Sequence, residues 1–291
     1  MGVIIIQIRR PLLIILMFVV AISFIITNNT KNDEELNDKI ITIQGVVKGK
    51  IEKKRYNQYK VGVFLINDYT KNKNLKIGQK VNITGKFKSL DKMKYDDFDY
   101  GRYIKSTGYK GIVYINNYKI IDKNKLYSLI GEIKFYISKT YRYLYKKNSD
   151  FINSILLAEV ENLTEEQKEI FTRTGTSHVI SISGLHTGIL CVIISFLLRG
   201  INKLYKLLIL SIFITLYCIM VGASPSIIRS IAFVMIFYLS IFIDRKKDGI
   251  SALSLIGIIL IMNNPYVIYN VSFQLSFLAT LSILIFYNKI N

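Results

Sequence analysis

The sequence contains few of the residue types that carry metals, disulfides or rigid turns. Its 291 residues include no tryptophan, two cysteines, two histidines and three prolines. Cys191 and Cys218 both lie in apolar runs, and we expect them to be small packing residues without a disulfide. Two histidines without a cysteine or carboxylate cluster match no usual zinc site. We therefore expect no bound metal and no cofactor.

Acidic residues are also scarce, with 20 Asp and Glu against 39 Lys and Arg, although 51% of the chain is hydrophobic. The two properties come from different regions. Lys39 to Lys125 contains 21 Lys and Arg against 7 Asp and Glu, a net of +14, whereas His178 to Tyr287 is nearly uncharged. This distribution predicts a basic soluble domain joined to a membrane domain. A low-GC genome also enriches lysine, so a purely compositional origin of part of the charge stays open.

Residues 1–30 predict an N-terminal transmembrane anchor. Pro11 to Thr27 is apolar and just long enough to span a bilayer. No small-residue cleavage site follows it, which favours an uncleaved anchor over a signal peptide. Arg9 and Arg10 precede the span, so we expect the N-terminus in the cytoplasm and the next domain outside the cell membrane.

Residues 38–122 predict an extracytoplasmic, OB-like small β-barrel. Short runs rich in β-branched and aromatic residues alternate with glycines. The predicted strands are Ile40 to Val47, Tyr59 to Ile66, Lys80 to Phe87, Tyr109 to Ile115 and Tyr118 to Ile121.

Residues 126–175 predict amphipathic, interfacial helices. Apolar residues from Leu126 to Leu144 recur at helical spacing, with cations between them, which favours a helix lying on the membrane surface. Thr164 to Gln167 has the sequence of a capping box and predicts the start of a further helix.

Residues 176–291 predict a multi-span α-helical membrane domain. The apolar spans are Val179 to Leu198, Leu207 to Val221, Ile227 to Ile243, Ile250 to Met262 and Val267 to Tyr287. Basic loops at Arg199 to Lys206 and at Arg245 to Lys247 alternate with neutral ones, so we expect the basic loops in the cytoplasm. The cations Arg9 and Arg10 before the first span and the alternating basic loops predict the same topology, that of a multi-pass protein of the bacterial cell membrane.

Polar residues inside these spans are the pore candidates. Ser183 and Gly184 favour a locally unwound helix, and His186 follows as a gate residue or as a histidine satisfied by a neighbouring helix. Arg229 is either a phosphate-attracting group at an outer mouth or a snorkelling cation. Gln274 contacts substrate or holds helices together.

The same residues leave two other functions open. Ser183 and His186 are three positions apart, within helical hydrogen-bond reach, but no nucleophile elbow and no nearby carboxylate accompanies them. We therefore predict no enzymatic activity. An intramembrane hydrolase and a small-solute transporter stay as alternatives.

The predicted barrel carries cations next to aromatic residues, the combination with which OB-folds bind single-stranded nucleic acid. For any one lysine, an ordinary solvated charge is the alternative. The DNA-binding candidates are Lys53, Lys54, Arg55, Tyr59, Lys60, Lys86, Lys88 and Arg102, with Lys105 and Lys110 as possible extensions of the groove.

Several sequence blocks occur in a characteristic order: Arg10-Pro11, Phe98 to Tyr103, Thr174 to His186, Pro225 to Arg229, Asn264-Pro265 and Phe273 to Phe277. In this order they resemble the N-terminal part of the ComEC-type competence family, the DNA-internalisation channels. The resemblance implies passage of single-stranded DNA across the cytoplasmic membrane in natural transformation. It also implies contacts with membrane lipids and with other DNA-uptake proteins, such as a receptor and a helicase or ATPase.

The chain departs from the family pattern at its end. Family members continue into more membrane helices, and many carry a metallo-β-lactamase-like domain, whereas this sequence stops at Asn291 without that ligand set. We therefore expect a truncated or split member that forms a homo-oligomer or pairs with a separate C-terminal part. A non-functional remnant is the remaining alternative.

Overall fold

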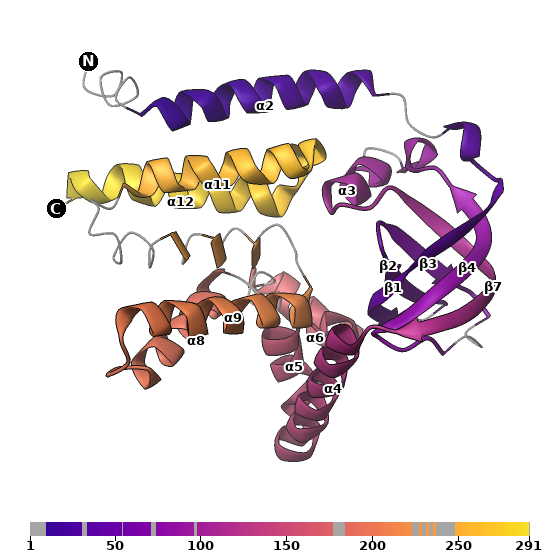
Figure 1. Cartoon of the computed structure of the whole chain (residues 1–291). Helices are drawn as coiled ribbons and strands as arrows, with labels where there is room; N and C mark the ends of the chain where they lie inside the picture. Colours follow the sequence, from indigo (N-terminus) through magenta and orange to yellow (C-terminus); the bar gives the residue numbers. More distant parts are fainter. Residues whose placement is uncertain are drawn as a thin grey trace.

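The computed structural model describes residues 10–30, 34–53, 55–70, 74–95, 98–176, 184–222, 227–228, 231–232, 235–236 and 248–290. A β-barrel lies at one end of a set of long helices that run roughly parallel to one another (Figure 1). Helices α4 (Lys125–Tyr145) and α5 (Ser149–Leu157) extend away from both parts (Figure 1).

Five strands close the barrel in the order β1-β2-β3-β7-β4. Strands β3 and β7 pair in parallel, and the other neighbours are antiparallel. The small barrel predicted from the sequence is therefore present. The strands are β1 (Ile40–Glu52), β2 (Asn57–Val61), β3 (Phe64–Asp68), β4 (Gln79–Lys88) and β7 (Gly111–Lys123).

Alternate strand residues fill the barrel interior, because successive side chains of a strand point to opposite faces. Val47, Tyr59, Ile66, Val81 and Val113 are among the fully buried members of this core. At about 25 cal/mol per Å² of apolar surface removed from water, this interior is the main source of barrel stability.

Two predicted strand boundaries are wrong. The run Tyr59 to Ile66 is a hairpin, not one strand, and its turn begins at Gly62, whose φ of 58° suits a residue without Cβ. The last two predicted strands are a single strand, β7. Asn117, which lay between the two predicted strands, pairs with Thr84 of β4, so the long-range ladder overrides local propensity.

The connection between β4 and β7 covers one outer side of the barrel. It contains η2 (Leu90–Lys92), β5 (Lys94–Tyr95), β6 (Phe98–Asp99) and α3 (Tyr100–Ser106). Its apolar residues pack with Leu65 and Ile112 on the outside of β3 and β7. A Cβ at Gly101 would lie 1.8 Å from the Leu90 carbonyl oxygen, so α3 approaches η2 this closely only through a glycine.

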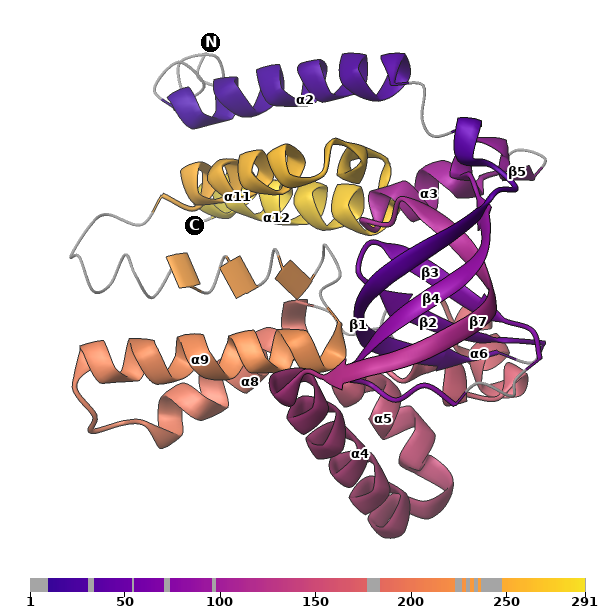
Figure 2. The same cartoon turned by 45° about the vertical axis from the view of Figure 1, so that its right-hand side comes forward.

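Helices α2 (Pro11–Asn29), α11 (Gly249–Asn263) and α12 (Val271–Ile290) lie side by side in both cartoon views (Figures 1 and 2). Leu16 and Val19 of α2 pack against the buried cluster of α11 and α12. The short helix η5 (Pro265–Tyr269) joins α11 to α12. Helices α8 (Gly184–Leu197) and α9 (Lys203–Val221) form a second pair around Cys191, Leu210 and Ile214.

Two helices of the described residues, α2 and α9, are long and apolar enough to cross a membrane by length and composition. Helices α8, α11 and α12 are apolar too, but their apolar stretches are shorter. The predicted span Ile227 to Ile243 lies mostly outside the described residues, as do residues 179–183 of the first predicted span, Val179 to Leu198.

The region after the barrel is helical, as predicted. It contains α4 (Lys125–Tyr145), η3 (Lys146–Asn148), α5 (Ser149–Leu157), η4 (Val160–Asn162) and α6 (Glu165–Arg173). The capping box is confirmed, because the Gln167 backbone N–H donates to Thr164 Oγ1 (3.2 Å) and the Thr164 N–H donates to Gln167 Oε1 (3.0 Å). Helix α4 exposes Leu129, Phe135 and Tyr143.

Candidate nucleic-acid interface

Three tyrosines form a continuous row on the barrel. Tyr56 precedes β2, Tyr69 follows β3 and Tyr114 lies in β7. The ring centroids of Tyr56 and Tyr69 are 4.8 Å apart, and those of Tyr69 and Tyr114 are 5.8 Å apart. These separations are typical of aromatic pairs in contact. The middle ring, Tyr69, is 55% exposed, so it offers an aromatic face to a ligand.

A local turn holds Tyr69 in the row. Asp68 is fully buried, and its Oδ1 accepts hydrogen bonds from the Thr70 N–H (3.1 Å) and hydroxyl (2.6 Å). This side chain-to-backbone pattern is an Asx turn, which fixes the backbone on both sides of the central residue. Tyr69 is therefore positioned before any ligand arrives.

Polar residues accompany the tyrosines across the sheet. Gln58 of β2 pairs with Asn67 of β3, Asn67 with Tyr114 of β7, and Tyr114 with Lys86 of β4. Side chains opposite one another on neighbouring strands share a face of the sheet. This face is the outer one, because Tyr59, next to Gln58, points into the core. Gln58 and Asn67 are themselves buried on this face, so the exposed ring of Tyr69 is the part that a ligand can reach. Gln58 Nε2 donates to Asn67 Oδ1 at 2.8 Å.

Cations lie at both ends of the tyrosine row. Lys53 Nζ lies 5.1 Å from the Tyr56 ring centroid and donates to its hydroxyl at 3.1 Å. Burial lowers the pKa of Lys53, but the hydrogen bond to Tyr56 together with the charges of Tyr56, Tyr100 and Glu161 outweighs burial and raises the pKa above its usual value. Arg55 is exposed in the same loop, and Lys54 lies outside the described residues. Lys86 is the cross-strand neighbour of Tyr114 at the other end.

Lys86 and Lys88 share one acidic partner. Lys86 Nζ lies 3.2 Å from Asp38 Oδ1, and Lys88 Nζ lies 4.0 Å from Asp38 Oδ2. One carboxylate next to two ammonium groups leaves this end of the row net positive. Such exposed pairs contribute little to stability, so phosphate can compete for these lysines.

One predicted DNA contact is corrected. The Tyr59 side chain is fully buried in the barrel core, so the prediction that its ring stacks on a base is wrong. Lys60 faces outward and is half-buried, and burial lowers its pKa, with Glu161 opposing the shift. Its phosphate contact stays a prediction.

Arg102 belongs to a different site. It lies in α3, where its guanidinium stacks over the Tyr269 ring at 4.5 Å. The neighbouring Lys105 carbonyl accepts a hydrogen bond from Asn264 Nδ2 (2.9 Å), and Asn270 Nδ2 donates to Ser106 Oγ (3.1 Å). The sequence blocks around Arg102 and Asn264 are thus brought together where the barrel meets the helices.

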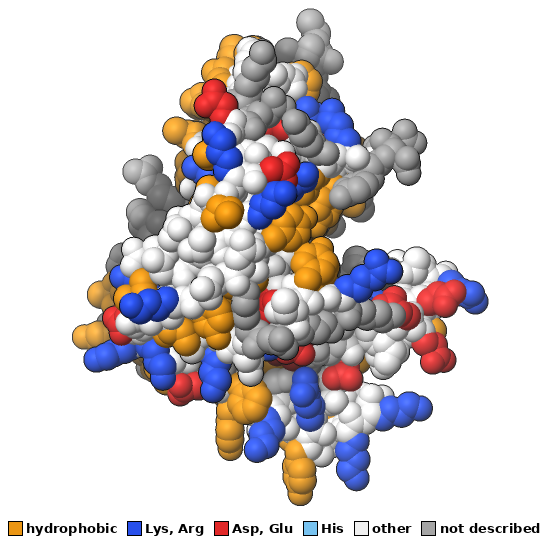
Figure 3. Space-filling view, turned by 90° about the vertical axis from the view of Figure 1, so that its right-hand side faces the viewer, with side chains coloured by type: hydrophobic (Ala, Val, Ile, Leu, Met, Phe, Trp, Pro, Cys, Tyr) orange, Lys and Arg blue, Asp and Glu red, His pale blue; other side chains and the backbone are white. Residues whose placement is uncertain are grey.

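Figure 3 shows the barrel side of the molecule. Lys and Arg side chains are scattered over this face, with hydrophobic and acidic groups between them. The high positive charge therefore does not by itself define a groove, and the tyrosine row locates the candidate interface more sharply.

The pore candidates are only partly described. Ser183 and Arg229 lie outside the described residues, and Gly184 is the first residue of α8. His186 is half-buried in α8, and the adjacent Thr187 is buried. Gln274 Nε2 donates to the Ile268 carbonyl at 2.7 Å, so its amide caps the end of η5. Within the described residues, no group of three His, Cys, Asp or Glu residues could hold a metal ion.

A closed barrel is joined to apolar helices, and two of the helices in the described part of the chain are long and apolar enough to cross a membrane by length and composition. The family model described as Competence protein matches residues 155–291. The resemblance to the competence family predicted from the sequence is therefore confirmed.

Two curated relatives match parts of the chain. ComE operon protein 3 of Bacillus subtilis (strain 168) is 26% identical over 165 residues, 56% of this chain and 21% of that protein. An uncharacterized protein of Aquifex aeolicus (strain VF5) is 30% identical over 125 residues, 43% of this chain and 30% of that protein. The chain thus spans less than a third of either relative.

Among solved structures, the aspartyl-tRNA synthetase of Entamoeba histolytica is matched at 11% identity with a TM-score of 0.23. The match covers 57% of this chain and 36% of that one. A similarity of this size supports no argument about the fold.

Proposed function

We propose that this chain is a membrane component of DNA uptake in natural transformation and that its barrel binds single-stranded DNA outside the cytoplasm. The observation that carries the proposal is the row Tyr56, Tyr69 and Tyr114 with Lys53 and Lys86 at its ends. Unpaired bases stack on aromatic rings while cations contact the phosphates. The competence-family match supports the same process.

The barrel topology favours this placement of the interface. The five strands close in the order β1-β2-β3-β7-β4. Strand β4 pairs antiparallel with both β1 and β7, and β3 pairs in parallel with β7, which is compatible with an OB-like barrel. Oligonucleotides bind such barrels on the face of the second and third strands and at the loops between the first and second and between the fourth and fifth strands. Tyr56, Lys53 and Arg55 belong to the loop between β1 and β2, and Tyr69 follows β3.

The helical region would then conduct the strand through the cell membrane, with Ser183, Gly184, His186 and Arg229 along the path. We propose a multi-pass arrangement with the N-terminus in the cytoplasm. Transport energy would come from partner proteins of the uptake machinery, such as a helicase or ATPase.

The test is binding of a fluorescent single-stranded oligonucleotide by the full chain in detergent, measured by anisotropy. We expect affinity to fall steeply between about 50 and 200 mM salt, because phosphate contacts release counterions. Replacing Lys53 and Arg55 by Glu should weaken binding and reduce the salt slope by about 0.7 per lost contact.

A matched control carries the same charge change farther along β7, with Lys119 and Lys123 replaced by Glu. It should keep more affinity than the loop variant. A duplex should bind more weakly than the single strand, because its bases are not free to stack. Equal weakening by both variants, or a preference for duplex, would contradict the proposed interface.

A further inference from the structure

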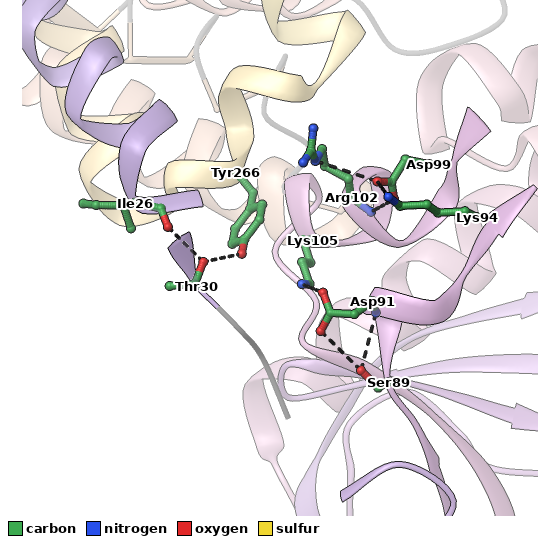
Figure 4. A network of polar contacts seen from close by, with 9 residues as sticks. All are labelled: Ile26, Thr30, Ser89, Asp91, Lys94, Asp99, Arg102, Lys105 and Tyr266. Carbon is green, nitrogen blue, oxygen red and sulfur yellow. Dashed lines mark hydrogen bonds and ion pairs between the residues drawn. The ribbon is translucent and has the colours of Figure 1, made fainter. Parts of the chain in front are cut away.

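A polar cavity of about 180 Å³ lies where the end of α2 meets the segment from η2 to α3. Thr27, Asn28 and Thr30 line it from the α2 side, and charged residues line it from the barrel side. Figure 4 shows the two sides facing each other, with Thr30 and Tyr266 opposite the charged cluster. The volume is about six times the share of one water molecule in the liquid, enough for a small polar group.

The cavity carries an excess of positive charge. Lys105 Nζ lies 2.5 Å from Asp91 Oδ1 with its side chain only 11% exposed, so these two charges neutralise each other. Among the described residues that line the cavity, Asp99 is the carboxylate near the other two cations: Lys94 Nζ is 4.0 Å and Arg102 Nε 3.8 Å from its Oδ2. Both distances exceed hydrogen-bond length. The described lining residues therefore carry a net charge of +1, which an anion would balance.

Arg102 is held in a fixed orientation. Its guanidinium lies over the Tyr269 ring, and the Tyr269 hydroxyl is 2.9 Å from Thr27 Oγ1, with either oxygen as donor. Asp99 also caps α3, because its Oδ1 accepts the Arg102 backbone N–H at 2.8 Å. A planar, oriented guanidinium binds the paired oxygens of a phosphate better than a mobile ammonium does.

The position of the cavity along α2 indicates which phosphate would occupy it. Exposed apolar side chains, including Phe18, Ile22 and Ile26, continue along α2 to its last turn, where Thr27 begins the polar lining. Tyrosines such as Tyr266 are enriched at this level of a bilayer, where hydrocarbon gives way to headgroups. A phospholipid whose acyl chains lie along α2 would place its phosphate at the cavity.

We propose that this cavity binds the phosphate of an anionic phospholipid headgroup and so fixes the barrel against the membrane surface. The inference rests on the membrane placement of α2 under the proposed function, but it does not depend on DNA binding. Lys94, 70% exposed, and Arg102, 40% exposed, are the groups that would contact the phosphate.

The test measures retention of fluorescent phosphatidylglycerol by the full chain purified in detergent. We expect Arg102→Gln to weaken retention about 10- to 100-fold, the range for a lost hydrogen bond to a charged group. Lys94→Gln should weaken it in the same direction. Because Lys94 is exposed and its contact is long, this second variant separates a binding defect from a folding defect. Lys119→Gln on β7, which removes the same charge elsewhere, should retain lipid like the unmodified chain.

Competition identifies the ligand. Diacylglycerol, which lacks the phosphate, should displace the probe poorly, and inorganic phosphate should require much higher concentrations than phosphatidylglycerol. Equal retention by all variants, or equal displacement by diacylglycerol, would overturn the proposal. Displacement by inorganic phosphate at the lipid's own concentration would reject the lipid and assign a free-phosphate site. Loss of oligonucleotide binding by the Lys53 and Arg55 variant alone would bear only on the proposed function.

Discussion

Removal of the Tyr69 ring is the most direct test of the candidate interface. Tyr69 is the middle member of the row, in contact with Tyr56 and Tyr114. Base stacking on one aromatic ring contributes about 1–3 kcal/mol. Tyr69→Ala should therefore weaken binding of a single-stranded oligonucleotide about 5- to 150-fold.

The same substitution also affects folding, and the structure bounds that effect. Since 55% of Tyr69 is exposed, somewhat less than half of its surface is removed from water. A tyrosine buries about 150–250 Å² when fully covered, so the lost burial is about 70–110 Å², or roughly 2–3 kcal/mol at 25 cal/mol per Å². This is an upper estimate, because unfolded chains already bury part of their apolar surface.

Two comparisons separate binding from folding. Tyr69→Phe keeps the ring and should bind nearly as well as the unmodified chain, whereas Tyr69→Leu keeps apolar volume without a π-face and should bind like Tyr69→Ala. Affinity is measured by fluorescence anisotropy with the full chain in detergent, and folding by circular dichroism at the same temperature. Undiminished affinity in a folded Tyr69→Ala chain would refute stacking on this row.

Three further predictions concern stability and orientation. Gly101→Ala places a methyl group 1.8 Å from the Leu90 carbonyl oxygen, so thermal unfolding should show a destabilisation of about 1–3 kcal/mol; an unchanged midpoint would contradict the close approach of α3 to η2. Burial lowers the pKa of Lys60 in the folded chain, so just below pH 10.5 the unfolded chain binds more protons than the folded chain. The free energy of unfolding should therefore rise as pH increases toward 10.5, and Lys60→Met should reduce this rise. An unaltered pH profile in the variant would contradict the lowered pKa. A cysteine at Lys119 should react with a membrane-impermeant maleimide in intact cells, and one at Ile201 only after permeabilisation; the reverse pattern would invert the proposed topology.

The sequence predicted the barrel and the capping box because both depend on local patterns. Alternating apolar residues and glycines mark strands, and Thr164 with Gln167 satisfies two backbone groups within four residues. The error at Tyr59 came from its place among the cations, without an assignment of its strand face. Tyr59 and Val61 are two positions apart in β2, so they share one strand face, and both are buried.

The tyrosine row could not be predicted, because pairing between distant segments creates it. Tyr114 reaches the row through the parallel ladder in which it pairs with Asn67, and no local pattern sets the register of that ladder. Tyr69 lies just beyond a strand whose end was not recognised. The sequence also could not show that Arg102 lies apart from the other basic candidates. Its contact with Tyr269 joins segments that are far apart along the chain.

Strand β7 connects the two sites. Its outward residues Ile112 and Tyr114 are two positions apart, about 7 Å along the strand. Ile112 packs beneath the segment that contains α3, and Tyr114 ends the tyrosine row. Through Asn264 and Asn270, α3 is hydrogen-bonded to the residues that flank η5, between α11 and α12. Under the proposed function, a strand of DNA held on the row would therefore lie next to the junction with the helices, where the proposed path through the membrane begins.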